Sequence, residues 1–475
     1  MYKIIYLLII LSCWQTSQAQ SEQRQFWALN GSFAGYTWDN TTGNNRTDNG
    51  SGTWNTSTSN WTINNGVANL NWKAGAAAIF GGNPGTGAAG TVTVSGTQTA
   101  SSLTFNPTAS GNFTLASGTI INVSGNIIAN DTALINCTLG GSAGLTLMGT
   151  SPITLTSLTT YTGTTTINSG TLILSNGTVG STTPTLTTPV VIASGGTLAA
   201  DILTGNINIS GAITGSGTLS IANTGVQSQS LRLYGNNSGF TGNFSEPSTT
   251  RGMMWSDNGG TGNAANTGSA AAAWNISGVF GFIETAGAAT PTVTLGSLSG
   301  SNSTTTIGGF GGSGIKTLQV GALNTNSSFA GAIQDNPQAT GTPVIALSKV
   351  GSGILTLSGT NTYSGATTVN AGTLAFTSAI PSSNTWDIAV NATSTPTTSN
   401  SGLMTIPSTF SLSGKTINIV LTGSSTGFTY IAVSWSGSVT FGPALQLNGT
   451  NVTSGIPSGG TTVTFVPGTG IRVSR

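Results

Sequence analysis

The chain offers few side chains that could carry out acid–base chemistry. It has no histidine, which removes the commonest general base and the commonest zinc ligand. The remaining candidates are ten widely separated carboxylates, namely Glu22, Asp39, Asp48, Asp131, Asp201, Glu246, Asp257, Glu284, Asp335 and Asp387. Enzymes that cleave glycosidic bonds need two carboxyl groups close together. A catalytic pair would therefore require distant segments of this chain to converge.

The densest group of reactive side chains lies at about residues 246–274. Glu246, Arg251 and Asp257 occur there, together with two methionines, in an otherwise neutral stretch. This change of texture predicts an inserted loop, and loops on a rigid scaffold often carry binding sites. A surface connection without a ligand would explain the same residues. A polysaccharide-cleaving enzyme that uses these three side chains is a third-ranked hypothesis, and we expect no catalytic activity.

The sequence contains no convincing motif for a metal, a nucleotide or a nucleic acid. Glycine pairs such as Gly81-Gly82 have no aspartate near them, unlike calcium-binding solenoid repeats. The glycine-rich segment 308–314 lacks the lysine of a phosphate-binding loop. The 11 lysines and arginines are scattered, which argues against nucleic-acid binding. We expect no metal and no cofactor.

Aromatic side chains are concentrated in residues 20–90, and two interpretations of them stay open. Bulky rings laid across a first coil of strands would cover its exposed edges and apolar interior, which predicts an N-terminal cap. Alternatively, exposed rings beside asparagine and aspartate would stack on sugars. The candidate carbohydrate-binding residues in that case are Trp38, Trp54, Trp61 and Trp72.

The elements that would position these residues are short strands. Between residues 91 and 380, runs of four or five residues alternate apolar with small polar side chains, as in Thr91–Val94 and Thr119–Val123. Glycine, asparagine or serine separates them every few residues, and no window has a helical period. This pattern predicts an all-β protein.

One unit of this texture occurs twice. Residues 349–376 read KVGSGILTLSGTNTYSGATTVNAGTLAF, and residues 158–174 read LTTYTGTTTINSGTLIL. A constant offset aligns the two segments, with Tyr161 on Tyr363. Recurrence of one supersecondary unit is the signature of a repeat architecture, in which neighbouring coils bury each other's apolar face.

The unit G-S-G-x-L-T-L-S-G-x-N-T-Y-S-G-x-T-T-V-N-A-G-T-L resembles the autotransporter-associated β-strand repeat of bacterial passenger domains. The resemblance is close over 349–376, good over 158–174 and degenerate elsewhere. It implies a right-handed parallel β-helix over residues 91–380 that lies on or outside the cell. It implies no particular activity, because the family is defined by a structural repeat.

The two ends of the chain carry separate expectations. Residues 1–19 have the charged start, apolar run and small-residue cleavage site of a signal peptide. Lipoprotein anchoring through Cys13 is a minor alternative. Residues 385–475 show longer alternating strands and predict a C-terminal β segment that closes the solenoid. We expect no transmembrane helix and no outer-membrane barrel in this chain.

These features together predict an exported structural or adhesive rod at the cell surface or in the medium. Its partners would be extracellular or cell-surface glycans or proteins, and a carbohydrate-binding surface protein is the main alternative. Only 4% of the residues are charged and the net charge is +1. We therefore expect a fold whose stability changes little with salt, or with pH between about 5 and 8, where no histidine titrates.

Overall fold

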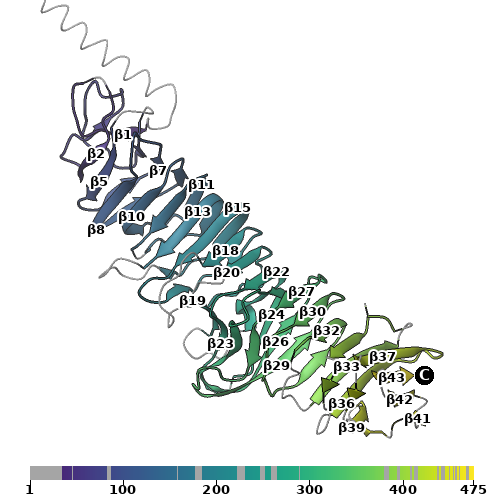
Figure 1. The fold of residues 1–475 in the computed structure, drawn as a ribbon. Coiled ribbons are helices and arrows are strands. Elements are labelled where there is room, and N and C mark those ends of the chain that lie inside the picture. Colours follow the sequence, from purple (N-terminus) through teal and green to yellow (C-terminus); the bar gives the residue numbers. More distant parts are fainter. Residues whose placement is uncertain are drawn as a thin grey trace, which may run out of the picture. The chain divides into compact units, whose positions relative to one another are not determined.

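In the computed structural model of the 475-residue chain, almost all of the regular secondary structure described is strand (Figure 1). The only helix among the residues described is one 3-10 turn, Ala265–Thr267. The structure describes residues 35–44, 46–82, 87–157, 159–176, 185–221, 230–246, 252–257, 265–287, 289–378, 385–392, 396–398, 400–406, 409–410, 416–435, 438–439, 444–448, 450–452, 454, 457–458, 461–466 and 470–475. The chain divides into two compact units, Met1–Ser151 and Pro152–Arg475. Each is described by itself.

The first unit contains two series of parallel strands. One series consists of β1 (Tyr36–Trp38), β4 (Ala77–Phe80), β7 (Ser102–Phe105), β9 (Asn126–Ala129) and β11 (Leu145–Gly149). The other consists of β2 (Gly50–Trp54), β5 (Ala89–Val94), β8 (Phe113–Val123) and β10 (Ala133–Gly140), with β6 (Gln98–Ala100) paired to β8. Successive strands of a series are a whole coil apart in sequence, which is the defining arrangement of a parallel β-helix.

The second unit begins with the same architecture. One sheet consists of β12 (Pro152–Leu155), β13 (Thr165–Ser175), β15 (Val190–Asp201), β18 (Thr218–Ile221), β20 (Asn243–Glu246), β22 (Ser269–Ile276) and β24 (Thr292–Ser299), with β17 (Ile213–Thr214) beside β15. The other consists of β14 (Thr185–Leu186), β16 (Ile207–Ile209), β19 (Ser230–Leu233), β21 (Gly252–Ser256), β23 (Phe280–Glu284), β25 (Thr306–Phe310) and β28 (Ala332–Gln334).

The first of these sheets branches at β24. The first half of β24 leads to β26 (Ser313–Val320), β29 (Thr342–Lys349), β31 (Thr367–Val369), β33 (Thr385–Ala392), β36 (Thr416–Gly423) and β39 (Ala444–Leu447). Just beyond its second half, a bridge between Gly300 and Phe329 leads to β27 (Ser327–Phe329), β30 (Ile354–Leu357), β32 (Gly372–Phe376), β34 (Gly402–Ile406) and β37 (Thr429–Trp435). The parallel β-helix thus continues well beyond residue 380.

Antiparallel pairing is confined to a few places in the part of the chain described. In the second unit, β37 pairs with β43 (Gly470–Ser474), β43 with β42 (Thr461–Val466) and β42 with β41 (Pro457–Ser458). The strand β39 pairs antiparallel with β40 (Thr450–Asn451). The short strands β35 (Thr409–Phe410) and β38 (Ser438–Val439) instead pair parallel with each other. In the first unit, β3 (Trp61–Thr62) pairs antiparallel with β1. The C-terminal segment is therefore β-rich as predicted, but most of it is parallel.

The core lies between the sheets of each unit and is built by alternation. In β30, Leu355 and Leu357 point inward and are buried, while Ile354 remains 40% exposed although it is apolar. In β32, Leu374 and Phe376 occupy the corresponding inward positions and pair with Leu355 and Leu357. Burying apolar surface contributes about 25 cal/mol per Å², so these stacked inward rows are the main source of stability.

The prediction of an inserted loop at about residues 246–274 is not supported by the structure. The described part of this range does not form an inserted loop, because β21 pairs with β19 and β23, and β22 pairs with β20 and β24. Both faces of β21 are buried, so the period-two alternation that identifies a strand is missing from its sequence, Gly-Met-Met-Trp-Ser. Residues 247–251 and 258–264 lie outside the described residues, as does the predicted signal peptide with Cys13.

Candidate functional site

The four tryptophans predicted to bind carbohydrate are buried. Trp38, Trp54 and Trp61 are fully inaccessible, and Trp72 is 4% exposed. Their rings form one cluster with mostly edge contacts, and the closest pair, Trp61 and Trp72, is tilted at a centroid distance of 4.6 Å. These residues therefore do not form the exposed aromatic face that the carbohydrate-binding hypothesis requires, since buried rings cannot stack on a sugar.

The same cluster occupies the place where a cap was predicted. The strand β3, which carries Trp61, pairs with β1, and the other side of β1 pairs with β4. The tryptophan rings also contact Phe80 in β4, which stacks on Phe105 of the next coil at 5.2 Å. The rings thus lie over the interior of the first coil described. Residues 20–34 of the predicted cap are outside the described part of the chain.

The predicted acidic candidates do not assemble into a site. Glu246 points into the core at the end of β20 and is completely inaccessible. This burial raises the pKa of Glu246 well above its ordinary value, an effect only partly opposed by the backbone N–H of Gly278. Asp257 instead accepts a hydrogen bond of 2.8 Å from the backbone N–H of Ala286 on the next coil. Arg251 lies outside the described residues.

A different charged cluster does form across neighbouring coils. Arg232 of β19 donates from Nη1 to both carboxyl oxygens of Glu284 in β23, at 3.1 and 3.3 Å. The hydroxyl of Ser256 donates to the same carboxylate at 2.5 Å. The strand register accounts for this cluster. Arg232 pairs with Met254 and Ser256 pairs with Glu284, so the three polar side chains lie on three successive strands.

Lys316 completes this cluster from inside the coil. It is fully buried in β26, and its Nζ donates to the hydroxyl of Thr285. Desolvation lowers the pKa of Lys316 to about 8, although the negative charges of Asp257 and Glu284 oppose the shift. Because Lys316 is sealed from solvent, a substrate could not reach its amine. We interpret the cluster as an internal polar link between coils.

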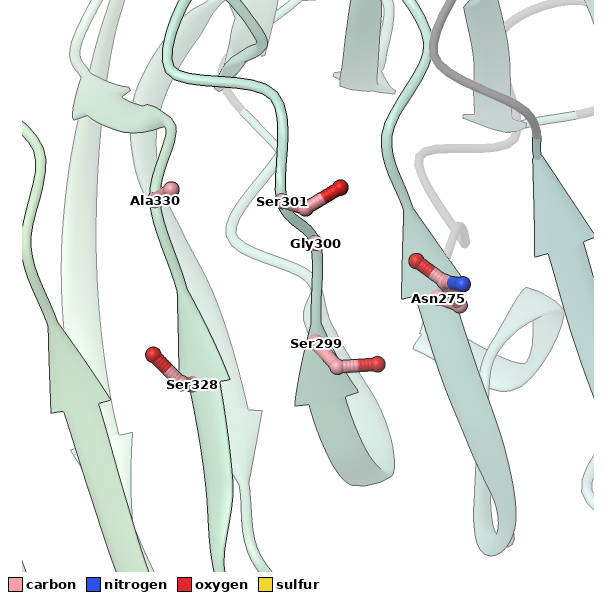
Figure 2. Close-up of a pocket in the computed structure, with 6 residues that line it drawn as sticks. All are labelled: Asn275, Ser299, Gly300, Ser301, Ser328 and Ala330. Atoms are coloured by element: carbon pink, nitrogen blue, oxygen red, sulfur yellow. The ribbon is translucent and has the colours of Figure 1, made fainter.

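The described surface contains an open groove with a volume of about 340 Å³. Figure 2 shows its lining, which comes from three neighbouring coils: Asn275 at the end of β22, Ser299, Gly300 and Ser301 at and after the end of β24, and Ser328 and Ala330 at β27. The groove lies where the sheet branches. Hydroxyl and amide groups line it together with two small residues, and none of its lining side chains carries a charge.

Glycine is required at the centre of this groove. A Cβ atom at position 300 would lie 2.1 Å from the carbonyl oxygen of Ile276 on the preceding coil. Next to this close approach, the backbone N–H of Ser301 donates to Ser277 Oγ on the preceding coil at 3.1 Å. The groove can donate and accept neutral hydrogen bonds. It holds no base that would activate a serine.

The two repeat copies share a buried hydrogen bond. The hydroxyls of Tyr161 and Thr165 are 2.7 Å apart, and those of Tyr363 and Thr367 are 2.9 Å apart. Both tyrosines are buried, so the threonine four residues later satisfies a hydroxyl that water cannot reach. Sequence comparison had aligned the two tyrosines, but the role of the threonine needed the structure.

A buried lysine begins the second copy. The Nζ of Lys349 donates to the carbonyl oxygens of Val350, Gly351 and Ala371, at 2.7, 2.7 and 3.2 Å. These carbonyls belong to two successive coils, so the ammonium group ties the coils together. Desolvation lowers the pKa of Lys349 to about 8. Nothing in the residue pattern around Lys349 indicated that this charged residue would be internal.

Comparison with known proteins identifies the repeat. Residues 141–174 and 347–376 match the family model of the passenger-associated-transport-repeat. These segments include both copies found from the sequence, so the predicted resemblance is confirmed for them. A search of curated proteins and a search of solved structures gave no significant match. Among the described residues, no helix has the length and apolar character needed to cross a membrane.

Proposed function

We propose that this chain is an exported surface protein of the autotransporter passenger type, with a structural and adhesive role and no catalytic activity. The observation that carries the proposal is the pair of repeat matches at 141–174 and 347–376, in a chain whose sheets are those of a parallel β-helix. A scaffold of this kind presents long uncharged faces. The sealed position of Lys316 and the neutral lining of the groove support a non-catalytic role.

Export is tested with an epitope inserted between Lys73 and Ala74, two exposed residues at a turn. The full chain is expected to be labelled by antibody on intact bacterial cells or found in the medium, with a mature N-terminus near residue 20. The matched control lacks residues 2–19 and is expected to stay inside the cell. Retention of the full chain in the cytoplasm would refute the proposal.

The lipoprotein alternative has its own test. Metabolic labelling with a fatty acid is expected to leave the full chain unlabelled, and the Cys13→Ser variant is expected to be processed like the parent. Incorporation of label that disappears in Cys13→Ser would instead establish an anchored lipoprotein. Either result leaves the surface location in place, so this test separates retention from export.

The absence of catalysis is tested by incubating the purified full chain with neutral and acidic polysaccharides. We expect no release of new sugar ends. Release would direct attention to Asp257 and Glu284, which the register brings onto neighbouring coils. Loss of release in Glu284→Gln would then mark an active site, and the non-catalytic proposal would be abandoned.

A carbohydrate-binding surface protein is the second candidate. The observation in its favour is the uncharged groove of Figure 2. The four tryptophans do not support it, because they are buried.

A further inference from the structure

The groove is part of a longer feature of the second unit. Strand register places one outward residue of each coil above the next, in a line that we call the hydroxyl row: Ser220, Ser245, Asn275, Ser299, Ser328, Thr356, Thr405 and Ser434, with Ala375 between the last two threonines. Ser299 and Ser328 are neighbours because Gly300 bridges to Phe329 and donates its N–H to the Ser328 carbonyl at 3.1 Å.

The strands that carry the hydroxyl row present no charged side chain on this face. Glu246 is the only charged residue within β18, β20, β22, β24, β27, β30, β32, β34 and β37, and it points inward. A second outward line runs beside the row and contains Thr218, Asn243 and Ala273. It ends at Ser297, which is buried. Two charged residues lie on strands beside the row. Asp201 ends β15, and its carboxylate accepts a hydrogen bond from Ser175. Arg472 is exposed on β43, which pairs with β37 at the far end of the row.

The hydroxyl row is periodic and hollowed at its middle. Parallel strands lie about 4.8 Å apart, so the row repeats a donor–acceptor group at that interval, which is close to the length of one sugar residue in an extended polysaccharide. Asn275, Ser299 and Ser328 belong both to the row and to the groove of about 340 Å³. The side chains of Asn275 and Ser328 are exposed. The row therefore offers regularly spaced contacts together with one recess.

We propose that the hydroxyl row binds an extended, uncharged polysaccharide that runs from coil to coil, with one stretch of it seated in the groove. The proposal rests on the adhesive role proposed above and names its partner. Charge decides the class of polymer, because anionic chains are held by lysine and arginine, and the row has neither. A protein partner is disfavoured because the row lacks the aromatic and arginine anchors of protein interfaces.

The chemistry also predicts how binding depends on length and salt. Each hydroxyl contact is weak, since it replaces a hydrogen bond to water. Affinity must therefore accumulate over many coils, as in multivalent association. Long chains are expected to bind much more tightly than their short oligosaccharides, and raising the salt concentration is expected to leave binding unchanged.

The test is co-sedimentation of the purified full chain with insoluble glucans, mannans and chitin, and with acidic polysaccharides in parallel. We expect retention by at least one neutral polymer that is equal at low and high salt. The triple variant Asn275→Val, Ser299→Val, Ser328→Val is expected to bind at least roughly ten-fold more weakly, the loss that three neutral hydrogen bonds give. The control variant Thr91→Val, Thr93→Val changes exposed outward threonines of β5 in the first unit and is expected to bind like the parent.

Three outcomes would overturn the proposal: no retention by any neutral polymer, retention only by acidic polymers at low salt, or equal binding by the triple variant and the parent. Circular dichroism of each variant must match the parent, and a single variant Ser328→Arg provides a steric block if the triple variant does not fold. Surface labelling of cells tests export independently. Failure of the polysaccharide test therefore leaves the proposed location intact.

Discussion

At the scale of single residues, the repeat is held by polar groups that the core has enclosed. Tyr363 is completely buried, and its hydroxyl lies 2.9 Å from the hydroxyl of Thr367. Tyr161 and Thr165 reproduce the pair in the other copy. A buried hydroxyl without a partner costs about 1–3 kcal/mol, so this pair explains why a threonine follows the tyrosine at the same distance in both copies.

A double-mutant cycle tests this pair. Thr367→Val is expected to lower the free energy of unfolding by about 1–2 kcal/mol, because it strands the tyrosine hydroxyl. Tyr363→Phe is expected to have a similar effect by stranding the threonine. The double variant should lose clearly less than the sum of the two, as measured by denaturant unfolding. Additive losses would show that the two hydroxyls do not stabilise each other.

Glu246 predicts a pH dependence that the sequence did not suggest. The unfolded carboxyl ionises above its ordinary pKa of about 4.5, whereas burial keeps the folded carboxyl protonated to a higher pH. The folded state then binds more protons, so the free energy of unfolding falls as pH rises above about 4.5. The fall ends when the pH passes the pKa of the folded protein.

Glu246→Met tests this origin, because methionine fills a similar volume and does not titrate. The variant is expected to be more stable than the parent at pH 7 and to lack the decline in stability above about pH 4.5. Chemical unfolding at a series of pH values measures both effects. A decline of the same size in the variant would assign it to another group.

At the scale of elements, close packing of coils depends on glycine in the repeat. Gly170 and Gly372 are equivalent in the two copies and have φ values of 75° and 68°. A Cβ atom at position 372 would lie 2.4 Å from the carbonyl oxygens of Gly351 and Gly353 on the preceding coil. The position therefore excludes a side chain for two reasons, backbone conformation and contact between coils.

The contribution of contact can be separated from that of conformation. Gly372→Ala and Gly75→Ala both place alanine at a positive φ, 68° and 81°, but the alanine at 75 would meet nothing within 4 Å. Gly75→Ala is expected to cost roughly 1 kcal/mol of stability. Gly372→Ala should cost at least roughly twice as much, as judged by the midpoint of thermal unfolding. Equal losses would mean that the coils can separate to admit the methyl group.

The elements also show what sequence can and cannot predict. The strand β5 contains the predicted run Thr91–Val94, where one face is apolar and the other is not. The strand β21 was missed, since the outward Met254 is also buried, against Phe280 and Phe282. Asn237, whose side chain accepts from Ile213 N–H and donates to the Thr267 carbonyl, could not be singled out among many asparagines.

The candidate site was less predictable than the fold. Trp38, Trp54, Trp61 and Trp72 were identified by residue type, but type alone does not tell a covering ring from a binding ring. The groove at Gly300 depends on the register between coils, and adjacent coils are about 25 residues apart, as the pairing of Asn275 with Ser299 shows. That register cannot be read from a single sequence that has no clear repeat in this region.

At the scale of the whole molecule, charged groups affect stability more through their burial than through salt bridges. The described residues contain two salt bridges, Arg46–Asp48 and Arg232–Glu284, and the arginine of the first is 63% exposed. Pairs that are exposed to solvent contribute little to stability. The expected insensitivity to salt therefore stays a prediction, whereas the expectation of insensitivity to pH between about 5 and 8 has to be revised because Glu246 is buried.

The two buried lysines predict the opposite effect from Glu246: they should make the free energy of unfolding rise with pH. Burial lowers the pKa of Lys316 and of Lys349 to about 8, against 10.5 for an exposed lysine. Between these values the unfolded lysines bind more protons than the folded ones, so they should raise the free energy of unfolding as pH rises. The rise should be clearest from pH 8 to 9, because above pH 9 the buried Cys137 thiol, whose pKa is raised, opposes it. Unfolding at several pH values measures this. A flat profile between pH 8 and 9 in the parent would contradict the internal position of the amines.

The antiparallel strand β43 occupies the edge of β37, the last parallel strand of its sheet among the residues described. An open edge on a parallel stack is a template on which a coil from another copy could continue the sheet. Since β43 runs against that direction and β42 covers β43 in turn, the template is changed before it can be copied. The antiparallel strands thus act as a terminator of polymerisation: they end growth of the sheet within one copy and oppose fibre formation at that edge.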